Sequence, residues 1–174
     1  MKKIKKKNKG ILFWITGLSG SGKTQIGKKI KKQISKIYGP TIFTSGDDMR
    51  NIFELNKYTN KARISNSKKF GKFCKFVTNE NINIIFALIS LREKTREWNR
   101  KNISNYVEIY IKTDIKKIME IGKKKVYKNF NKNIVGIDIK AEFPKLPDII
   151  IENNFDKSIK QLSSDLIKKI RKII

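Results

Sequence analysis

Two patterns of hydrophobic and polar positions alternate along the chain. Short apolar runs rich in β-branched residues predict strands at about 11–16, 41–44, 82–89, 105–113 and 146–151. Apolar residues at helical spacing between and after them predict helices at about 25–38, 61–80, 93–101, 114–121 and 156–174. Strands that are apolar on both faces are typical of parallel sheets covered by helices. The pattern therefore predicts an α/β fold with a doubly wound, five-stranded parallel sheet.

Two segments do not fit this alternation. Residues 1–9 are a lysine run, which we expect to form a solvated and partly disordered basic arm. Residues 122–147 are rich in lysine, contain Gly136 and two prolines, and show no clear periodicity. Long irregular segments in compact domains are usually functional flaps, so this segment predicts a lid. The remaining length suits one domain over residues 10–174.

A phosphate-binding motif lies between the first strand and the first helix. It reads Gly17-Leu18-Ser19-Gly20-Ser21-Gly22-Lys23-Thr24 and fits G-x-x-x-x-G-K-[ST]. The glycines allow consecutive backbone N–H groups to turn toward a phosphate. Lys23 would reach the β- and γ-phosphates of ATP, and the Thr24 hydroxyl would ligate Mg²⁺. The motif predicts a P-loop nucleotide-binding fold.

The same segment also has the outline of a signal peptide. A basic stretch at 1–9 precedes an apolar run at 11–18, and small residues follow. Cleavage there would discard the phosphate-binding motif. We therefore expect the segment to remain in the mature protein.

The second strand ends at a polar segment, Ser45-Gly46-Asp47-Asp48-Met49-Arg50. Ligands of open α/β sheets bind beyond the carboxyl ends of the strands, so this segment should face the same crevice as the phosphate loop. A carboxylate there can position Mg²⁺ and an attacking hydroxyl, and Arg50 can hold an acidic acceptor. Either aspartate could instead cap the next helix, and one can cap while the other does chemistry.

Composition narrows the function classes. Lysine and arginine number 41 against 15 aspartate and glutamate, giving a net charge of +26, which would attract any polyanion. These cations are spread along the chain among Ile and Asn, and no recognisable nucleic-acid-binding motif accompanies them. Nucleic-acid binding is therefore not expected as the main role. The absence of histidine excludes imidazole catalysis and histidine-ligated metal sites.

The apolar runs are too short to span a membrane, for which about 20 residues are needed. The single cysteine, Cys74, cannot form an intrachain disulfide and is predicted on the buried face of a helix. These features favour a cytoplasmic protein.

Together the motifs resemble the adenylylsulfate kinase family from about Phe13 to Asn153. Residues 13–24 are close to F-W-[FIL]-T-G-L-S-G-[SA]-G-K-[ST], and residues 46–50 are similar to G-D-N-x-R. Further matches are Tyr58-Thr59, Arg63, Asn66 and Gly71; Ala87-Leu88-Ile89-Ser90; Lys124 and Val126-Tyr127-Lys128; and Gly136-Ile137-Asp138, Glu142, Pro144, Pro147 and Asp148.

The resemblance implies a reaction and a set of site residues. The reaction is transfer of the γ-phosphoryl of ATP to the 3′-hydroxyl of adenosine 5′-phosphosulfate (APS). Gly17 to Thr24 would bind ATP, Thr24 and Asp47 would hold Mg²⁺, and the catalytic residues would be Lys23, Asp47 and Ser90. The residues implied to bind APS are Arg50, Tyr58, Arg63, Asn66, Ile89, Ser90, Lys128 and Ile134. A homodimer is implied as well.

Two of these implied roles need comment. Tyr58 would stack on the APS adenine. Ser90 stands where a phosphoserine intermediate has been proposed for the family. In-line transfer between two bound nucleotides, however, depends on positioning and charge neutralisation more than on a covalent phosphoenzyme intermediate.

The chain departs from the family pattern at several positions. Ser45 replaces an acidic residue, Asp48 replaces an asparagine, and Ile121-Gly122 replaces an Arg-Asp pair that precedes the lid motif. Ile134 stands where the family often has a second stacking phenylalanine, a loss of about 1–3 kcal/mol by analogy with base stacking. Two alternatives therefore stay open: a kinase of another small acidic or nucleotide-like metabolite, and a degenerate ATP-binding protein without catalysis.

Overall fold

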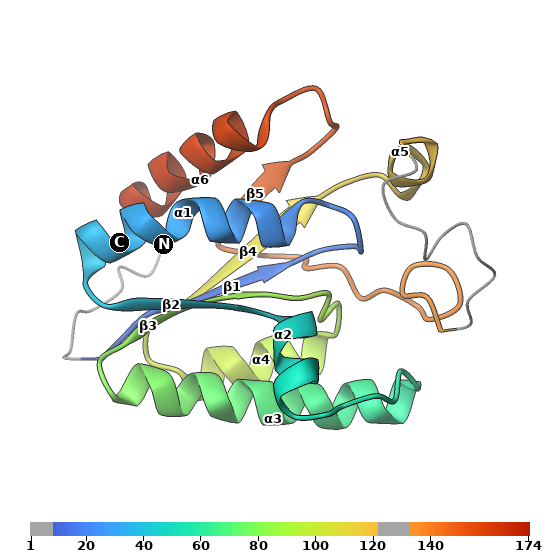
Figure 1. The fold of residues 1–174 in the computed structure, drawn as a ribbon, viewed down its shortest axis with the longest axis horizontal. Helices are drawn as coiled ribbons and strands as arrows, with labels where there is room; N and C mark the ends of the chain where they lie inside the picture. Colours follow the sequence, from blue (N-terminus) through green and yellow to red (C-terminus); the bar gives the residue numbers. More distant parts are fainter. Residues whose placement is uncertain (1–8, 122–132) are drawn as a thin grey trace.

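The computed structural model describes residues 9–121 and 133–174, which form a twisted parallel sheet between two layers of helices (Figure 1). The strands are β1 Leu12–Thr16, β2 Thr41–Ser45, β3 Asn83–Ala87, β4 Tyr106–Lys112 and β5 Ile149–Glu152. Their order in the sheet is β2-β3-β1-β4-β5, and every neighbouring pair is parallel. The predicted five-stranded parallel sheet is confirmed.

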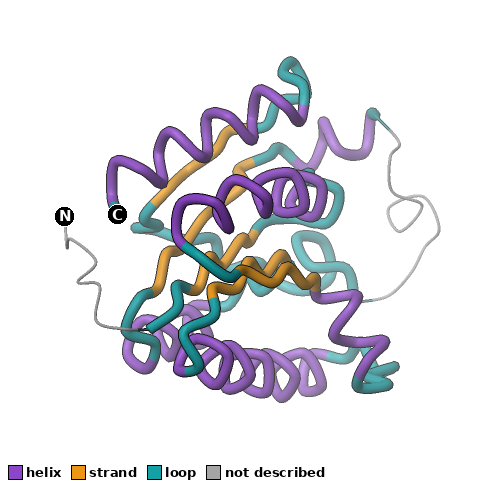
Figure 2. Tube along the Cα trace, turned by 60° about the vertical axis from the view of Figure 1, so that its left-hand side comes forward, coloured by secondary structure: helices purple, strands orange, loops and turns teal. Residues whose placement is uncertain are grey.

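The helices cover both faces of this sheet, as a doubly wound fold requires. Their bounds are α1 Lys23–Tyr38, α2 Gly46–Ile52, α3 Asn60–Asn79, α4 Glu93–Asn102, α5 Ile115–Glu120 and α6 Ile159–Ile173. Helices α1 and α6 lie together on one face, and α3 and α4 lie on the other (Figures 1 and 2). Because β1 is the central strand, the loop that follows it lies in the middle of the carboxyl edge of the sheet.

The alternating side chains of β1 divide the core into two layers. Phe13 and Ile15 belong to the cluster formed with α1 and α6, whereas Leu12 and Trp14 belong to the cluster formed with α3. All five residues of β1 are buried. The apolar stripe of α1, at Ile26, Ile30 and Ile34, is fully buried against the first cluster. Burial of such a side chain contributes about 1.5–3 kcal/mol, so this packing fixes where the first strand and helix meet.

Two elements differ in detail from the sequence-based expectation. No helix was predicted between the second strand and the helix at 61–80, but the polar segment after β2 forms a short helix of its own, α2. The fifth strand was expected from Leu146, but pairing with β4 begins at Ile149, after Pro147, which has no N–H to donate. Leu146 is accordingly 89% exposed.

Part of the expected lid, residues 122–132, lies outside the described residues. From residue 133 to residue 147 the chain forms no helix or strand beyond an isolated bridge between Val135 and Ile139. Among the helices that the structure describes, none is long and apolar enough to cross a membrane.

Candidate active site

The phosphate loop connects β1 to α1 at the carboxyl edge of the sheet, and its glycines have conformations that other residues adopt rarely. Gly20 has φ 81° and Gly22 has φ 88°, in the left-handed region. At Gly17, a Cβ atom would lie 2.5 Å from the carbonyl oxygen of Ile111. The loop is also held from the end of β5, where Asn153 Nδ2 donates to the Ser21 carbonyl at 3.1 Å. The conformation of the phosphate loop is therefore fixed by its glycines and by the hydrogen bond from Asn153.

Lys23 lies inside this loop, where it is only 7% exposed. Its Nζ donates to the Leu18 carbonyl at 2.5 Å and lies 3.4 Å from Ser21 Oγ. A phosphate oxygen entering the loop can take over from these neutral acceptors and gain a charge-assisted bond. Leu18 contributes its backbone to the loop, while its side chain is buried in an apolar cluster beneath it.

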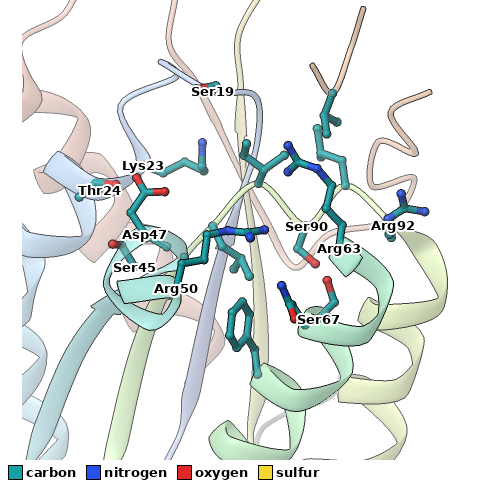
Figure 3. Close-up of a pocket in the computed structure, with 18 of the residues that line it drawn as sticks. Ser19, Lys23, Thr24, Ser45, Asp47, Arg50, Arg63, Ser67, Ser90 and Arg92 are labelled. Carbon is teal, nitrogen blue, oxygen red and sulfur yellow. The ribbon is translucent and has the colours of Figure 1, made fainter. Parts of the chain in front are cut away.

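The two aspartates after β2 have different environments. Ser45 caps α2 by accepting from Asp48 N at 3.1 Å, and Asp48 Oδ2 accepts from Ser45 N and Ser45 Oγ, both at 2.8 Å. Asp48 therefore completes a capping box. Asp47 takes no part in it, and its side chain lies on the same side of the cavity as Lys23 and Thr24 (Figure 3).

A cavity of about 500 Å³ joins the phosphate loop to the opposite wall. We call the side with Lys23, Thr24 and Asp47 the loop end, and the side with Arg63, Ser90 and Arg92 the arginine end (Figure 3). The two ends can hold two ligands in one enclosure, which transfer of a group between them requires.

Magnesium ion fits the loop end. Thr24 and Asp47 both line it, and no cluster of three or more Asp, Glu, Cys or His that could hold a metal exists in the described part of the chain. Mg²⁺ is commonly held by one or two protein ligands together with substrate phosphates and water. Thr24 and Asp47 are a sufficient protein contribution on that basis.

The arginines of the cavity are bonded to neutral groups. Arg50 Nη1 lies 3.3 Å from the Leu55 carbonyl and 3.4 Å from the Lys57 carbonyl. Arg92 donates to the side-chain oxygen of Asn60. Neither arginine has a carboxylate partner among the described residues, so their positive charges are not neutralised within the described structure.

Arg63 shows the effect of these charges most directly. Its Nε donates to the Tyr58 carbonyl at 3.0 Å and its Nη2 to the Asn133 carbonyl at 3.2 Å. Burial lowers the pKa of Arg63, and the positive charges of Arg50 and Arg92 lower it further. An anion bound at the arginine end would offset all three effects, so this end favours an anionic ligand.

Arg96 and Arg100, in contrast, are neutralised by carboxylates. Arg96 Nε lies 3.0 Å from Glu108 Oε1, and Arg100 bridges Glu108 at 3.0 Å and Asp148 at 3.2 Å. Burial lowers the pKa of Arg100, but the hydrogen bonds and charges of Asp148 and Glu108 together outweigh it and raise the pKa above its ordinary value. These two arginines stabilise the junction of α4, β4 and β5, and they do not line the cavity.

Ser90 is held in an unusual position at the arginine end. Its φ of 21° is positive, and within the described residues its buried hydroxyl has no hydrogen-bond partner. Non-glycine residues in sparsely populated backbone regions cost about 1–3 kcal/mol and cluster at functional sites. The neighbouring Ile89 carbonyl accepts from Thr16 Oγ1 at 2.5 Å, which links this segment to the end of β1.

Most of the predicted site residues line one cavity. They are Ser19, Gly20, Gly22, Lys23, Thr24, Asp47, Arg50, Arg63, Asn66, Ile89 and Ser90. Gly17, Leu18 and Ser21 lie within the loop but do not line the cavity. Lys128 lies outside the described residues.

Two predicted acceptor-binding residues are not among the lining residues. The Tyr58 ring packs against the guanidinium groups of Arg50, at 4.6 Å, and Arg63, at 5.5 Å, and is 51% exposed. The backbone of Ile134 closes a turn by accepting from the amides of 137–139. Neither side chain offers a stacking surface inside the cavity in this arrangement.

The sequence prediction missed several lining residues. Ser67 and Phe70 share the face of α3 that carries Arg63 and Asn66, so helical spacing could have indicated them. Arg92 follows β3 closely, at the edge where ligands bind. For Val135, Ile139 and Lys140 no signal existed, because they lie in a segment without periodicity.

Comparison with known proteins agrees with this geometry. The family model for adenylylsulphate kinase matches residues 9–152. Cytidine diphosphoramidate kinase of Campylobacter jejuni is 34% identical over 168 residues, which cover 94% of this chain and 98% of that protein. Adenylyl-sulfate kinase of Clostridium kluyveri is 30% identical over 153 residues, which cover 84% of this chain and 77% of that protein.

The fold comparison gives the same result. An APS kinase of Mycobacterium tuberculosis, solved in complex with AMPPNP and APS, superposes with a TM-score of 0.82, 21% identity and coverage of 94% of this chain and 98% of that chain. At this identity the likeness shows the fold, while the family model and the relatives show the family. The chain therefore belongs to the adenylylsulphate kinase family of ATP-dependent kinases.

Proposed function

We propose that this kinase phosphorylates a hydroxyl of a nucleotide that carries an anionic anhydride group, with cytidine diphosphoramidate as the first candidate and APS as the second. ATP and Mg²⁺ are its cofactors, as in its family. The observation that carries the proposal is the cavity itself. It joins the phosphate loop and Asp47 to three arginines that have no carboxylate partner among the described residues.

The reaction would proceed by in-line transfer. The acceptor oxygen forms a bond to the γ-phosphorus while the bond from that phosphorus to the β–γ bridging oxygen breaks, and ADP leaves. The acceptor proton passes to the carboxylate of Asp47, which lies at the loop end beside Lys23 (Figure 3).

The loop end supplies charge stabilisation for this step. The loop amides and Lys23 Nζ bind the β- and γ-phosphates, so that the charge on the transferred group is met by fixed donors. Mg²⁺, held by Thr24 and Asp47, would neutralise charge on the same phosphates. Arg50, Arg63 and Asn66 would orient the acceptor so that its hydroxyl faces the donor.

Two observations favour cytidine diphosphoramidate over APS. The chain spans 98% of the Campylobacter jejuni relative but 77% of the Clostridium kluyveri adenylyl-sulfate kinase. Ile134 also replaces a stacking phenylalanine of the APS kinase pattern, and Tyr58 packs against arginines instead of facing the cavity. A smaller pyrimidine base loses less than adenine when stacking surface is removed.

An acceptor assay tests the proposal. Release of ADP from ATP and Mg²⁺ is measured with cytidine diphosphoramidate, APS and a panel of sugars and nucleosides. We expect the highest kcat/KM with cytidine diphosphoramidate. A preference for APS would select the second candidate, and a preference for an uncharged sugar would overturn the proposal. Binding of ATP without turnover of any acceptor would support a degenerate nucleotide-binding protein instead.

We also propose a homodimer. Ile52 and Phe53 are adjacent at the end of α2 and are 69% and 51% exposed, and an interface between two copies of the chain would bury both side chains. Light scattering of the purified protein would measure the mass, and a monomer over the whole micromolar range would exclude the proposal.

A further inference from the structure

We propose that Lys140, paired with Arg92, recognises the terminal anionic group of the acceptor and so sets a preference for diphosphate-type acceptors over monophosphates. This inference rests on the proposed function and names the substrate class of the same site. Lys140 and Arg92 both line the cavity, although they are 48 positions apart in the sequence.

Glu142 joins the segment that carries Lys140 to the residues on either side of Arg92. Its backbone N donates to the Leu91 carbonyl at 3.0 Å, and its carboxylate accepts from Glu93 N at 2.6 Å. These two bonds lie on either side of Arg92 in the sequence. Lys140 is two residues before Glu142 on the same strap, which we define as residues 139–142. The strap and the start of α4 are therefore joined where the two cations face the cavity.

The strap is bonded to a residue of the protein core. Arg96 Nη1 donates to the Glu142 carbonyl at 2.9 Å, and Arg96 is 5% exposed and ion-paired to Glu108. Arg92, the N-cap residue of α4, provides no side-chain cap, so the Glu142 carboxylate takes that role from another part of the chain. A carboxylate at a helix N-terminus is also favoured by the helix dipole. The strap thus has a fixed position relative to the cavity wall.

The charges of the cavity leave this pair available for an anion. The lining residues include five cations, Lys23, Arg50, Arg63, Arg92 and Lys140, but one carboxylate, Asp47. Asp47 lies at the loop end (Figure 3). Lys140 forms no hydrogen bond or ion pair with any described residue, and Arg92 bonds to the neutral amide of Asn60.

The two side chains suit different parts of such a group. The guanidinium of Arg92 can make two parallel bonds to the oxygens of a phosphoryl group. Lys140 is a mobile point charge on a long stem, which can follow the outermost oxygen of the ligand. A nucleoside monophosphate would occupy Arg50 and Arg63 and leave Lys140 without a ligand, whereas a second phosphoryl-type group would extend to the strap.

Kinetics with cytidine diphosphate and cytidine monophosphate as acceptors test this inference. We expect the wild-type protein to prefer the diphosphate. Lys140→Gln should lower kcat/KM for the diphosphate about tenfold, the loss of one hydrogen bond to a charged group, and leave the monophosphate within about twofold. Lys140→Arg should restore the preference. Lys145→Gln is the matched control, because Lys145 is exposed nearby in the chain and does not line the cavity.

Binding separates this inference from the proposed function. Affinity for the two nucleotides is measured by calorimetry with the phosphate loop saturated by AMPPNP and Mg²⁺, so that no turnover is needed. A diphosphate preference that Lys140→Gln removes would support the pair even if no acceptor is phosphorylated. An equal loss for both nucleotides, or no loss for either, would overturn the inference even if the kinase reaction is found.

Discussion

Asp47 and Asp48 are adjacent in the sequence, yet the structure gives them separate tasks. Asp48 completes the capping box of α2 with Ser45, and Asp47 lines the cavity beside Lys23 and Thr24. The sequence predicted that one aspartate could cap while the other acts on the substrate. It could not say which, because that depends on where α2 begins.

Substitution of the two aspartates should separate their tasks. Asp47→Asn should lower turnover by about 10²-fold or more, because the acceptor proton loses its base, while ATP binding persists. Asp48→Ala should cost about 0.5–2 kcal/mol of stability through the cap and leave turnover within severalfold. Steady-state kinetics, nucleotide binding and urea unfolding would measure the two effects. Equal activity of Asp47→Asn and wild type would remove Asp47 from the mechanism.

The single thiol should be unreactive in the folded protein. Cys74 is fully buried in α3, as its apolar neighbours in the sequence predicted, and burial raises its pKa well above the ordinary value. The reactive thiolate is therefore scarce at neutral pH and shielded from reagents. Titration with a chromogenic disulfide should show a slow reaction in buffer and complete reaction in denaturant. A fast reaction in buffer would mean that α3 opens locally.

Helices and strands were predicted well where neighbouring residues carry the hydrophobic periodicity. Segments were predicted less well where bonds to residues far away in the sequence fix their position. The apolar runs of β1 and β3 and the helical stripe of α1 carry their own signal in neighbouring residues. The strap at 139–142 carries none, because its position comes from bonds between Glu142 and residues near the start of α4, such as Glu93, 49 positions away. The lining residues Lys140 and Ile139 were missed for that reason.

The junction of α4, β4 and β5 should depend strongly on one carboxylate. Glu108 is 4% exposed and pairs with both Arg96 and Arg100. Glu108→Gln would leave the buried Arg96 without a counter-charge, which should lower the free energy of unfolding by about 3–5 kcal/mol.

Glu152→Gln is the matched control for that experiment. Glu152 lies on β5, pairs with Lys112, and has a side chain that is 62% exposed. Its loss should cost less than about 1 kcal/mol, because exposed pairs are screened by solvent. Urea unfolding of both variants would show the difference. Similar costs would mean that water solvates Arg96 in the folded protein.

At the scale of the whole molecule, the charge of +26 is distributed in two ways. Some cations are neutralised and stabilise the fold, as at Arg96 and Arg100, while others line the cavity without a described carboxylate partner, as at Arg63 and Arg92. Composition gave the size of the excess and could not show this division. The division depends on which carboxylates the fold places near each arginine.

The excess charge should make stability depend on salt. Self-repulsion destabilises a compact state of high net charge, and the screening length falls from about 30 Å at 0.01 M to about 8 Å at 0.15 M ionic strength. Raising sodium chloride over this range should therefore raise the melting temperature by a few degrees. Chloride is preferred to sulfate, which could bind the cavity itself. A melting temperature that falls with salt would show that attractive pairs dominate.

The bond from Thr16 Oγ1 to the Ile89 carbonyl connects the strand that leads into the phosphate loop with the segment that carries Ser90. The spacing between the loop end and the segment that carries Ser90 is thereby tied to the separation of adjacent strands, which the sheet keeps constant at about 4.8 Å. Redesign of this enzyme for a new acceptor should therefore start at the strap, where side chains can change without moving either strand. Changes at Thr16 would alter the alignment for every acceptor alike.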